Sequence, residues 1–132
     1  MLAVIVFSVL SVLSCDRRRA PQPFEIPAAP LAAVPAAARA FYEGRCRRCH
    51  GPAGAGDGPD GRALRPPPRA LRDRLWQSNG STDHLRAVLV AGGGAVGKSP
   101  AMPAAPELRR DPALLDGMVT LVRALAERPD AR

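Results

Sequence analysis

The hydrophobic positions of the chain form one long apolar run and three stretches with helical spacing. The run extends over residues 2–13 without a charge. Further along, apolar residues recur at i, i+3 and i+4, which is the spacing of one helix face. These sets are Ala38, Phe41 and Tyr42; Leu85, Val88 and Leu89; and Leu114, Met118, Leu121, Val122 and Leu125. The chain also contains 15 prolines and 12 glycines. The pattern predicts an all-α fold with few helices and long Gly/Pro loops.

Residues at the ends of these stretches indicate where the helices begin and stop. Pro35 suits the first turn of a helix that extends through the CRRCH sequence at 46–50, and Asp111 followed by Pro112 suits the start of a final helix at roughly 112–127. Ser81 or Thr82 can cap the middle helix, which the glycines after it end. Only 4% of the residues are aromatic, so the core is thin. Such a chain often needs a metal or a covalent cofactor to stabilise it.

The apolar run at the N-terminus ends at a cysteine. It is shorter than the about 20 residues of a membrane-spanning helix, and it suits the apolar region of an export signal. The end of the run, VLSC, resembles the lipobox of bacterial lipoproteins, in which the signal is removed before the cysteine and the cysteine is acylated. We therefore expect a signal peptide at 1–14, lipidated Cys15 as the mature N-terminus, and a location on the periplasmic side of the membrane. Because no Lys or Arg precedes the run, an uncleaved membrane-associated segment is the alternative.

Residues 15–35 are rich in proline and alanine and show no helical period, which predicts an extended tether. The formal net charge of the chain is +7. A basic surface suits an acidic partner, although enrichment in Ala, Arg, Pro and Gly also follows from a biased genome. Nothing resembles a nucleic-acid-binding motif, so we expect no nucleic-acid partner.

CRRCH at 46–50 is the C-x-x-C-H signature of covalent haem attachment. Two thiols three positions apart can form thioethers with the two vinyl groups of one haem, and the adjacent histidine can bind the iron. A zinc site would want about four ligands, but there is no second cysteine pair. A thioredoxin-like redox pair would follow a strand, whereas a helical stretch precedes this motif. The sequence predicts one covalent haem c, with Cys46 and Cys49 as attachment residues and His50 as an iron ligand.

The sequence GGGAVGKS at 92–99 matches the phosphate-binding loop of nucleotide-binding enzymes. Such a loop must open a helix whose N-terminus faces the phosphates. Pro100 could occupy a first helical turn, but Pro103 and Pro106 exclude a regular helix at this point. We therefore expect no nucleotide site here.

Several segments together resemble a class I (mitochondrial-type) bacterial cytochrome c, over about residues 35–127. They are ARAFYEGRCRRCHGPAGAGDGP, LRPPPRAL, GGGAVGKSPAMP and the final helix. The resemblance implies a cytochrome c domain at 36–128, with helices packed around the haem. It also implies that the sixth iron ligand is a methionine on a loop and followed by proline, which fits Met102. Met118 is expected in the core, and His84 is the rival ligand.

Further expectations rest on this resemblance. A proline carbonyl is expected to accept a hydrogen bond from His50; the candidates are Pro59 and the triplet at 66–68, and we favour the triplet. Pro67 and Leu71 are then haem-packing residues. Ala38 stands where glycine is usual, which suggests a slightly wider helix crossing. Trp76 is either a propionate donor or a core residue. The basic residues near the haem either pair with propionates or face an acidic partner; they are Arg45, Arg47, Arg48, Arg65, Arg69 and Lys98.

These expectations describe an electron-transfer protein rather than an enzyme, because His/Met ligation leaves no open position on the iron. The redox partner is expected to be acidic at its docking face, and the membrane is reached through the lipid anchor. Two alternatives stay open: a haem subunit of a larger respiratory or quinol-oxidising complex, and a haem sensor if Met102 is labile.

Overall fold

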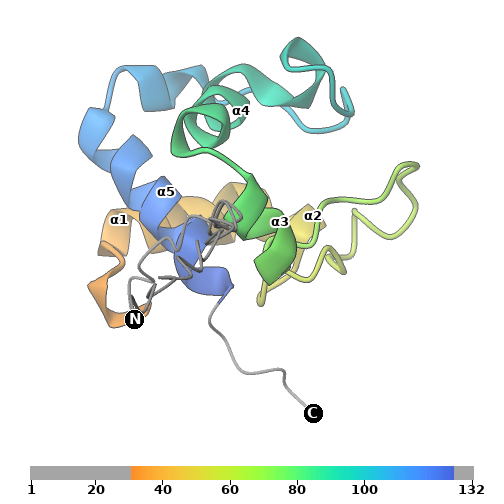
Figure 1. Cartoon of the computed structure of the whole chain (residues 1–132), viewed down its shortest axis with the longest axis horizontal. Coiled ribbons are helices and arrows are strands. Elements are labelled where there is room, and N and C mark those ends of the chain that lie inside the picture. The colour runs from red at the N-terminus through yellow and green to blue at the C-terminus, as the bar shows by residue number, and fades with distance from the viewer. Residues whose placement is uncertain (1–30, 127–132) are drawn as a thin grey trace, which may run out of the picture.

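The computed structural model describes residues 31–126, and this part of the chain contains helices and no strands (Figure 1). The prediction of an all-α fold is therefore confirmed for the described residues. In chain order the elements are η1 (Leu31–Ala33), α1 (Ala36–Phe41), η2 (Tyr42–Cys46), α2 (Arg47–His50), α3 (Arg74–Asn79), α4 (Thr82–Ala95), η3 (Pro106–Arg109) and α5 (Pro112–Leu125). The turn η2 is π-helical, whereas η1 and η3 are 3-10 turns.

The predicted helix ends agree with the structure. The side chain of Ser81 accepts a hydrogen bond from the backbone N–H of His84 (3.1 Å), which caps α4. The side chain of Asp111 accepts from the backbone N–H of Leu114 (2.9 Å), and Pro112 opens α5. These bonds satisfy N–H groups that a helix start otherwise leaves without a partner. Near the end of α4, Gly92 has a φ of 79° and interrupts the helix.

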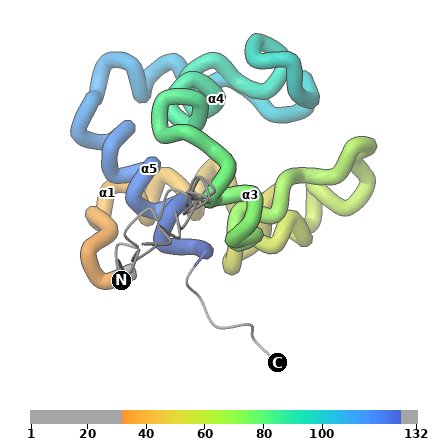
Figure 2. The backbone as a smooth tube through the Cα atoms, in the orientation of Figure 1, coloured from red at the N-terminus to blue at the C-terminus, as the bar shows by residue number. Residues whose placement is uncertain are grey.

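The first and last helices cross closely. Figure 2 shows the chain returning from α4 through η3 into α5, which lies beside α1. A Cβ atom placed on Gly117 of α5 would lie 3.1 Å from the Cβ atom of Ala38 and 3.3 Å from Cγ of Pro35. The small residue that the close crossing requires is thus Gly117 on the last helix. It faces Ala38 on the first helix.

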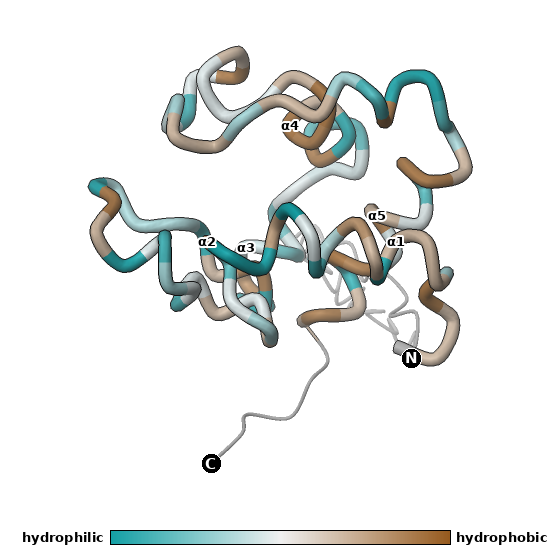
Figure 3. The backbone as a smooth tube through the Cα atoms, turned by 180° about the vertical axis from the view of Figure 1, so that it is seen from behind, coloured by the Kyte–Doolittle hydropathy of each residue, from teal (hydrophilic) through white to brown (hydrophobic). Residues whose placement is uncertain are grey.

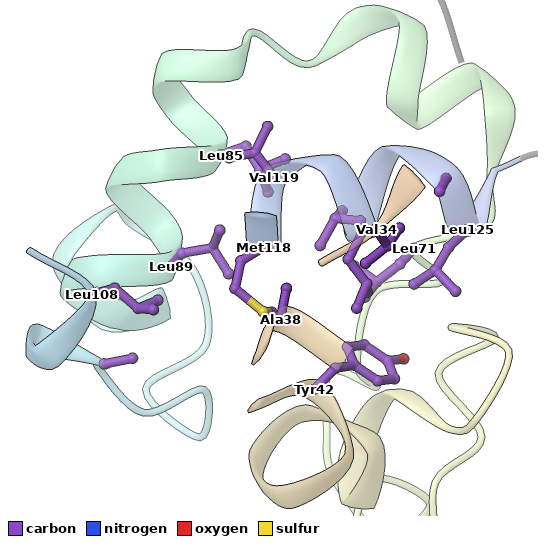
Figure 4. Close-up of a cluster of buried hydrophobic side chains, with 14 residues drawn as sticks. Val34, Ala38, Tyr42, Leu71, Leu85, Leu89, Leu108, Met118, Val119 and Leu125 are labelled. Atoms are coloured by element: carbon purple, nitrogen blue, oxygen red, sulfur yellow. The ribbon is translucent and has the colours of Figure 1, made fainter. Parts of the chain in front are cut away.

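The core is built around this crossing (Figure 4). Leu108 and Met118 are completely buried, so the expectation that Met118 is a core residue is confirmed. Leu85 and Leu89 contribute the buried face of α4. Tyr42 is also buried, and its hydroxyl donates to the carbonyl of Gly51 (2.7 Å). This bond ties the first helix to the start of the loop that follows the CRRCH motif.

Helix α3 was not expected from the sequence, and a buried polar pair holds it against α5. The guanidinium of Arg123 donates to the carbonyl and side-chain oxygens of Gln77 and to the carbonyl of Gly80, each at 2.7 Å. The amide of Gln77 in turn donates to the carbonyls of Leu71 and Val122, both at 2.7 Å. Burial lowers the pKa of Arg123. Carbonyls at the end of a helix need such donors when water cannot reach them.

We expect Arg123→Met to lower the free energy of unfolding by about 3 kcal/mol, because several buried oxygen atoms lose their donor at once. The measurement is chemical denaturation of the purified protein. Arg86→Met is the control. Arg86 is likewise an arginine that links two helices, but its ion pair with Asp116 joins α4 to α5 at the surface. Exposed ion pairs contribute about 0–1 kcal/mol. Equal losses in the two variants would contradict a special role for the buried pair.

Candidate haem site

The CRRCH motif lies at the end of a long helical run. Helices α1 and α2 are joined through η2 without a break, and Cys46, Cys49 and His50 are all half-buried. Both cysteines are free thiols. Burial raises the pKa of the Cys46 thiol to about 11, against the lowering effect of the Arg45 charge. A redox-active cysteine pair needs a lowered pKa, so this environment does not favour thioredoxin-like chemistry.

The side chain of His50 is oriented by a backbone carbonyl. Its Nδ1 lies 3.0 Å from the carbonyl oxygen of Arg69, which can only accept, so Nδ1 carries the proton. Burial lowers the pKa of His50, and the bond to Arg69 opposes this effect. With the proton on Nδ1, Nε2 carries the lone pair of the ring and is the nitrogen that could bind a metal. This is the second-sphere arrangement by which metal-binding histidines are usually fixed.

The carbonyl that holds His50 differs from the sequence expectation. The proline triplet at 66–68 was favoured as the source of this acceptor, but the acceptor is Arg69, the residue that follows the triplet. Pro67 is exposed, and Pro59 is exposed as well. The prolines therefore shape the approach of the loop, whereas the hydrogen bond comes from the next residue.

The loop at 51–70 folds back on the CRRCH helix. The backbone N–H of Gly58 donates to the carbonyl of Cys49 (3.1 Å), and that of Asp60 donates to the carbonyl of Arg48 (2.9 Å). A Cβ atom on Gly58 would collide with the carbonyls of Arg47 and Arg48. In the structure, Gly58 is required by close approach to the backbone of α2.

Met102 lies on a loop that α4 holds in place. The backbone N–H of Gly93 donates to the carbonyl of Met102 (3.0 Å), and that of Ala105 donates to the carbonyl of Val90 (3.2 Å). Met102 is half-buried, between two exposed prolines. The loop at 96–105 and the loop at 51–70 project to the same side of the molecule in both opposite views (Figures 1 and 3). Gly92 and Gly93 of the phosphate-loop match thus pack against the methionine segment.

Arg45 connects the two halves of the site. Its guanidinium forms an ion pair with Glu107 and donates to the carbonyl of Ala104 (3.3 Å). Arg45 directly precedes the first cysteine, and Ala104 lies two positions after Met102. The helix that carries the motif is therefore bonded to the segment that carries the methionine.

The chemistry of the donor set fits a haem better than a directly bound metal ion. Among the residues that the structure describes, no three His, Cys, Asp or Glu side chains are grouped so that they could hold a metal. Zinc would need such a group. A c-type haem needs only one imidazole and one further ligand on its iron, because the thiols bond to the porphyrin. His50 and Met102 could supply these ligands from two separate segments, and Cys46 and Cys49 lie in the same helical run as His50.

The remaining predicted residues lie in different places. Leu71 is buried in the core, where its Cβ atom lies next to Gly54. Trp76 is half-buried, with the guanidinium of Arg69 5.9 Å from the ring centroid. His84 is exposed. Cys15, the signal and most of the tether lie outside the described residues.

Sequence reasoning missed the site residues that act through long-range contacts. Arg69 acts through its main chain, which leaves no side-chain signal. Glu107 is 62 positions from Arg45, so the pairing has no local pattern. The only available signal was the position of Arg45 directly before the first cysteine.

Among the described residues, no helix has the length and apolar character needed to cross a membrane. Comparison of the chain with protein-family models, with curated proteins and with solved structures finds no match.

Proposed function

We propose that the protein is a membrane-anchored electron carrier with one c-type haem, attached to Cys46 and Cys49 and ligated by His50 and Met102. The observation that carries this proposal is the hydrogen bond from Nδ1 of His50 to the carbonyl of Arg69. It fixes the ring beside the two free thiols and leaves Nε2 as the donor atom.

When bound, the haem supplies a reversible one-electron change at its iron. The carbonyl of Arg69 would hold the imidazole of His50 in place, and the backbone N–H of Gly93 would hold the carbonyl of Met102. The thioether of Met102 is neutral and soft, and methionine ligation favours the reduced state and raises the potential. Two protein ligands leave no position for oxygen or peroxide. The ligand set therefore supports electron transfer rather than catalysis.

The distribution of positive charge supports docking of an acidic partner beside the His50 loop. Arg47 and Arg48 are neutralised by Glu43 and Asp60. Arg62 and Arg65 are exposed and donate only to backbone carbonyls, and neither forms an ion pair within residues 31–126. An acidic partner face would meet this charge, which speeds encounter without requiring tight binding.

The predicted lipid at Cys15 and the tether would keep this domain near the membrane. A tethered domain has a raised effective concentration for partners in the same membrane. A haem subunit of a larger respiratory complex would share these features. Co-purification after detergent extraction separates the two, since a subunit stays with its partners whereas a free carrier does not.

Met102→Ala tests the ligand assignment. We expect the oxidised haem-loaded variant to lose the long-wavelength absorbance band that accompanies methionine ligation in class I cytochromes c. The reduction potential should also fall, because the iron loses its soft ligand. Absorbance spectroscopy and potentiometry of the purified protein check both.

Met118→Leu is the matched control, because Met118 is completely buried in the core and leucine has a similar volume. It should keep the band. If wild-type protein lacks the band, or if Met102→Ala retains it, the assignment of Met102 is wrong. Haem that can be extracted without breaking a covalent bond would contradict the attachment residues.

A further inference from the structure

Arg45 makes three contacts with its side chain. It pairs with the carboxylate of Glu107, donates to the carbonyl of Ala104 (3.3 Å), and lies with its guanidinium carbon 5.7 Å from the ring centroid of Phe41. Phe41 belongs to the same helical run as Arg45, whereas Glu107 and Ala104 follow Met102 in the sequence. The ring thus supports the guanidinium on its own helix while the two hydrogen bonds reach the other segment.

The loop that carries Met102 is hydrogen-bonded to two different helical segments. Toward α4, it is held by the bond from Gly93 to the carbonyl of Met102 and by the bond from Ala105 to the carbonyl of Val90. On the side of the CRRCH helix, the guanidinium of Arg45 donates to the carbonyl of Ala104 and pairs with the carboxylate of Glu107. The planar guanidinium can satisfy both acceptors at once, which a lysine cannot do with the same geometry.

We propose that Arg45 is a positioning residue that latches the Met102 loop to the haem-attachment helix and so keeps Met102 on the iron. This inference rests on the proposed function, in which Met102 is an iron ligand. It gives Arg45 a role that differs from the two the sequence left open, propionate pairing and partner docking. The latch restrains how often the loop opens, and it does not itself touch the iron.

The chain provides a matched control for Arg45. Arg47 is also an exposed arginine of this helical run, and it also pairs with a glutamate, but that glutamate is Glu43 on the same run. The Arg47 pair therefore cannot restrain the Met102 loop. Each exposed ion pair contributes little to overall stability, so a difference between the two variants would report on the loop and not on general electrostatics.

The experiment is a titration of the oxidised, haem-loaded protein with imidazole. Imidazole binds the iron only when Met102 has left it, so its apparent affinity is proportional to the fraction of open loop. We expect Arg45→Met to raise this apparent affinity about three- to tenfold, which is the effect of losing one exposed ion pair and its attached hydrogen bond. Glu107→Gln should raise it in the same direction, and Arg47→Met should leave it unchanged.

The double variant Arg45→Met with Glu107→Gln completes the cycle. If the two residues act through one contact, the double variant binds imidazole no more tightly than Arg45→Met alone. Arg45→Lys should lie between wild type and Arg45→Met, since it keeps the charge and loses the fork. Thermal midpoints followed by circular dichroism verify that all variants remain folded.

Two results would overturn the latch, and they are distinguishable. If wild type shows methionine ligation and Arg45→Met binds imidazole as Arg47→Met does, the latch is wrong while the proposed function stands. If wild type already binds imidazole as tightly as Met102→Ala, Met102 is not the ligand, and the latch fails together with that part of the proposed function.

Discussion

Replacing Cys46 and Cys49 together with serine is expected to remove covalent haem from the protein. Both thiols are free and stand in the same helical run as His50, so they are the attachment points of the proposed haem. Haem staining after denaturing electrophoresis, with the protein produced alongside a cytochrome c maturation system, should show no haem on this variant. Cys49→Ser alone should retain a single thioether, detected as a shift of the reduced pyridine–haem spectrum.

The loss should extend to the fold. Few large side chains are completely buried in the described residues, Leu108 and Met118 being the largest. A small domain with such a core depends on a cofactor for stability. We therefore expect the double variant to show less helix by circular dichroism and rapid degradation in cells. Cys15→Ser is the control, which should keep its haem and lose only membrane attachment. A double variant with wild-type levels of haem resistant to denaturation would refute the attachment residues.

Gly92→Ala is expected to destabilise the protein by about 2–6 kcal/mol. Gly92 has a φ of 79° and a ψ of 170°, a region that is essentially restricted to glycine and costs a residue with a Cβ atom about 1–3 kcal/mol. The added Cβ would also lie 2.7 Å from the backbone nitrogen of Ala104 and 2.9 Å from the carbonyl oxygen of Met102. Relief of these contacts moves backbone, which adds about 1–3 kcal/mol. Denaturant unfolding measures the total, and the Met102 absorbance band should weaken with it.

Gly94→Ala tests whether the effect belongs to the position or to glycine in general. A Cβ atom on Gly94 would meet only Pro100, at an ordinary 3.5 Å, and Gly94 does not have a positive φ. Since alanine favours helical backbone over glycine by about 1 kcal/mol, this variant should be as stable as wild type or slightly more so. A loss as large as that of Gly92→Ala would show that the packing argument is wrong.

The helices could be predicted where local chemistry determines them. Ser81 and Asp111 cap α4 and α5 as their side chains and positions indicate, and the apolar period of the last helix identified Met118 as a core residue. Helix α3 has a cap of the same kind, since the side chain of Asp73 accepts from the backbone N–H of Trp76, but no apolar period marks it. Its residue Leu75 is 72% exposed, and apart from the half-buried Trp76 the helix is held by the polar pair of Gln77 and Arg123.

In the candidate site, only the side chains proposed to attach or ligate the haem could be predicted from the sequence. Cys46, Cys49 and His50 form a local motif whose spacing indicates its chemistry. The carbonyl of Arg69 and the pairing of Arg45 with Glu107 depend on how distant segments meet, and main-chain acceptors look alike at every position of a sequence. The match to a phosphate-binding loop shows the same limit. Its glycines would suit close approach to a phosphate, and they equally suit close approach to another backbone segment. In the structure Gly92 and Gly93 lie against the segment of Met102.

The unbroken helical run from α1 to α2 has a mechanical consequence. Its first residues follow Val34, which is buried in the core, and its last residue is His50. At a rise of 1.5 Å per residue, the run spans roughly 20 Å. The end of the predicted tether and the proposed iron ligand are thus the two ends of one continuous helical run. If the lipid anchor is present, tension on the tether would be borne by the core at Val34, and the tilt of this helical run would set the height and orientation of His50 above the bilayer.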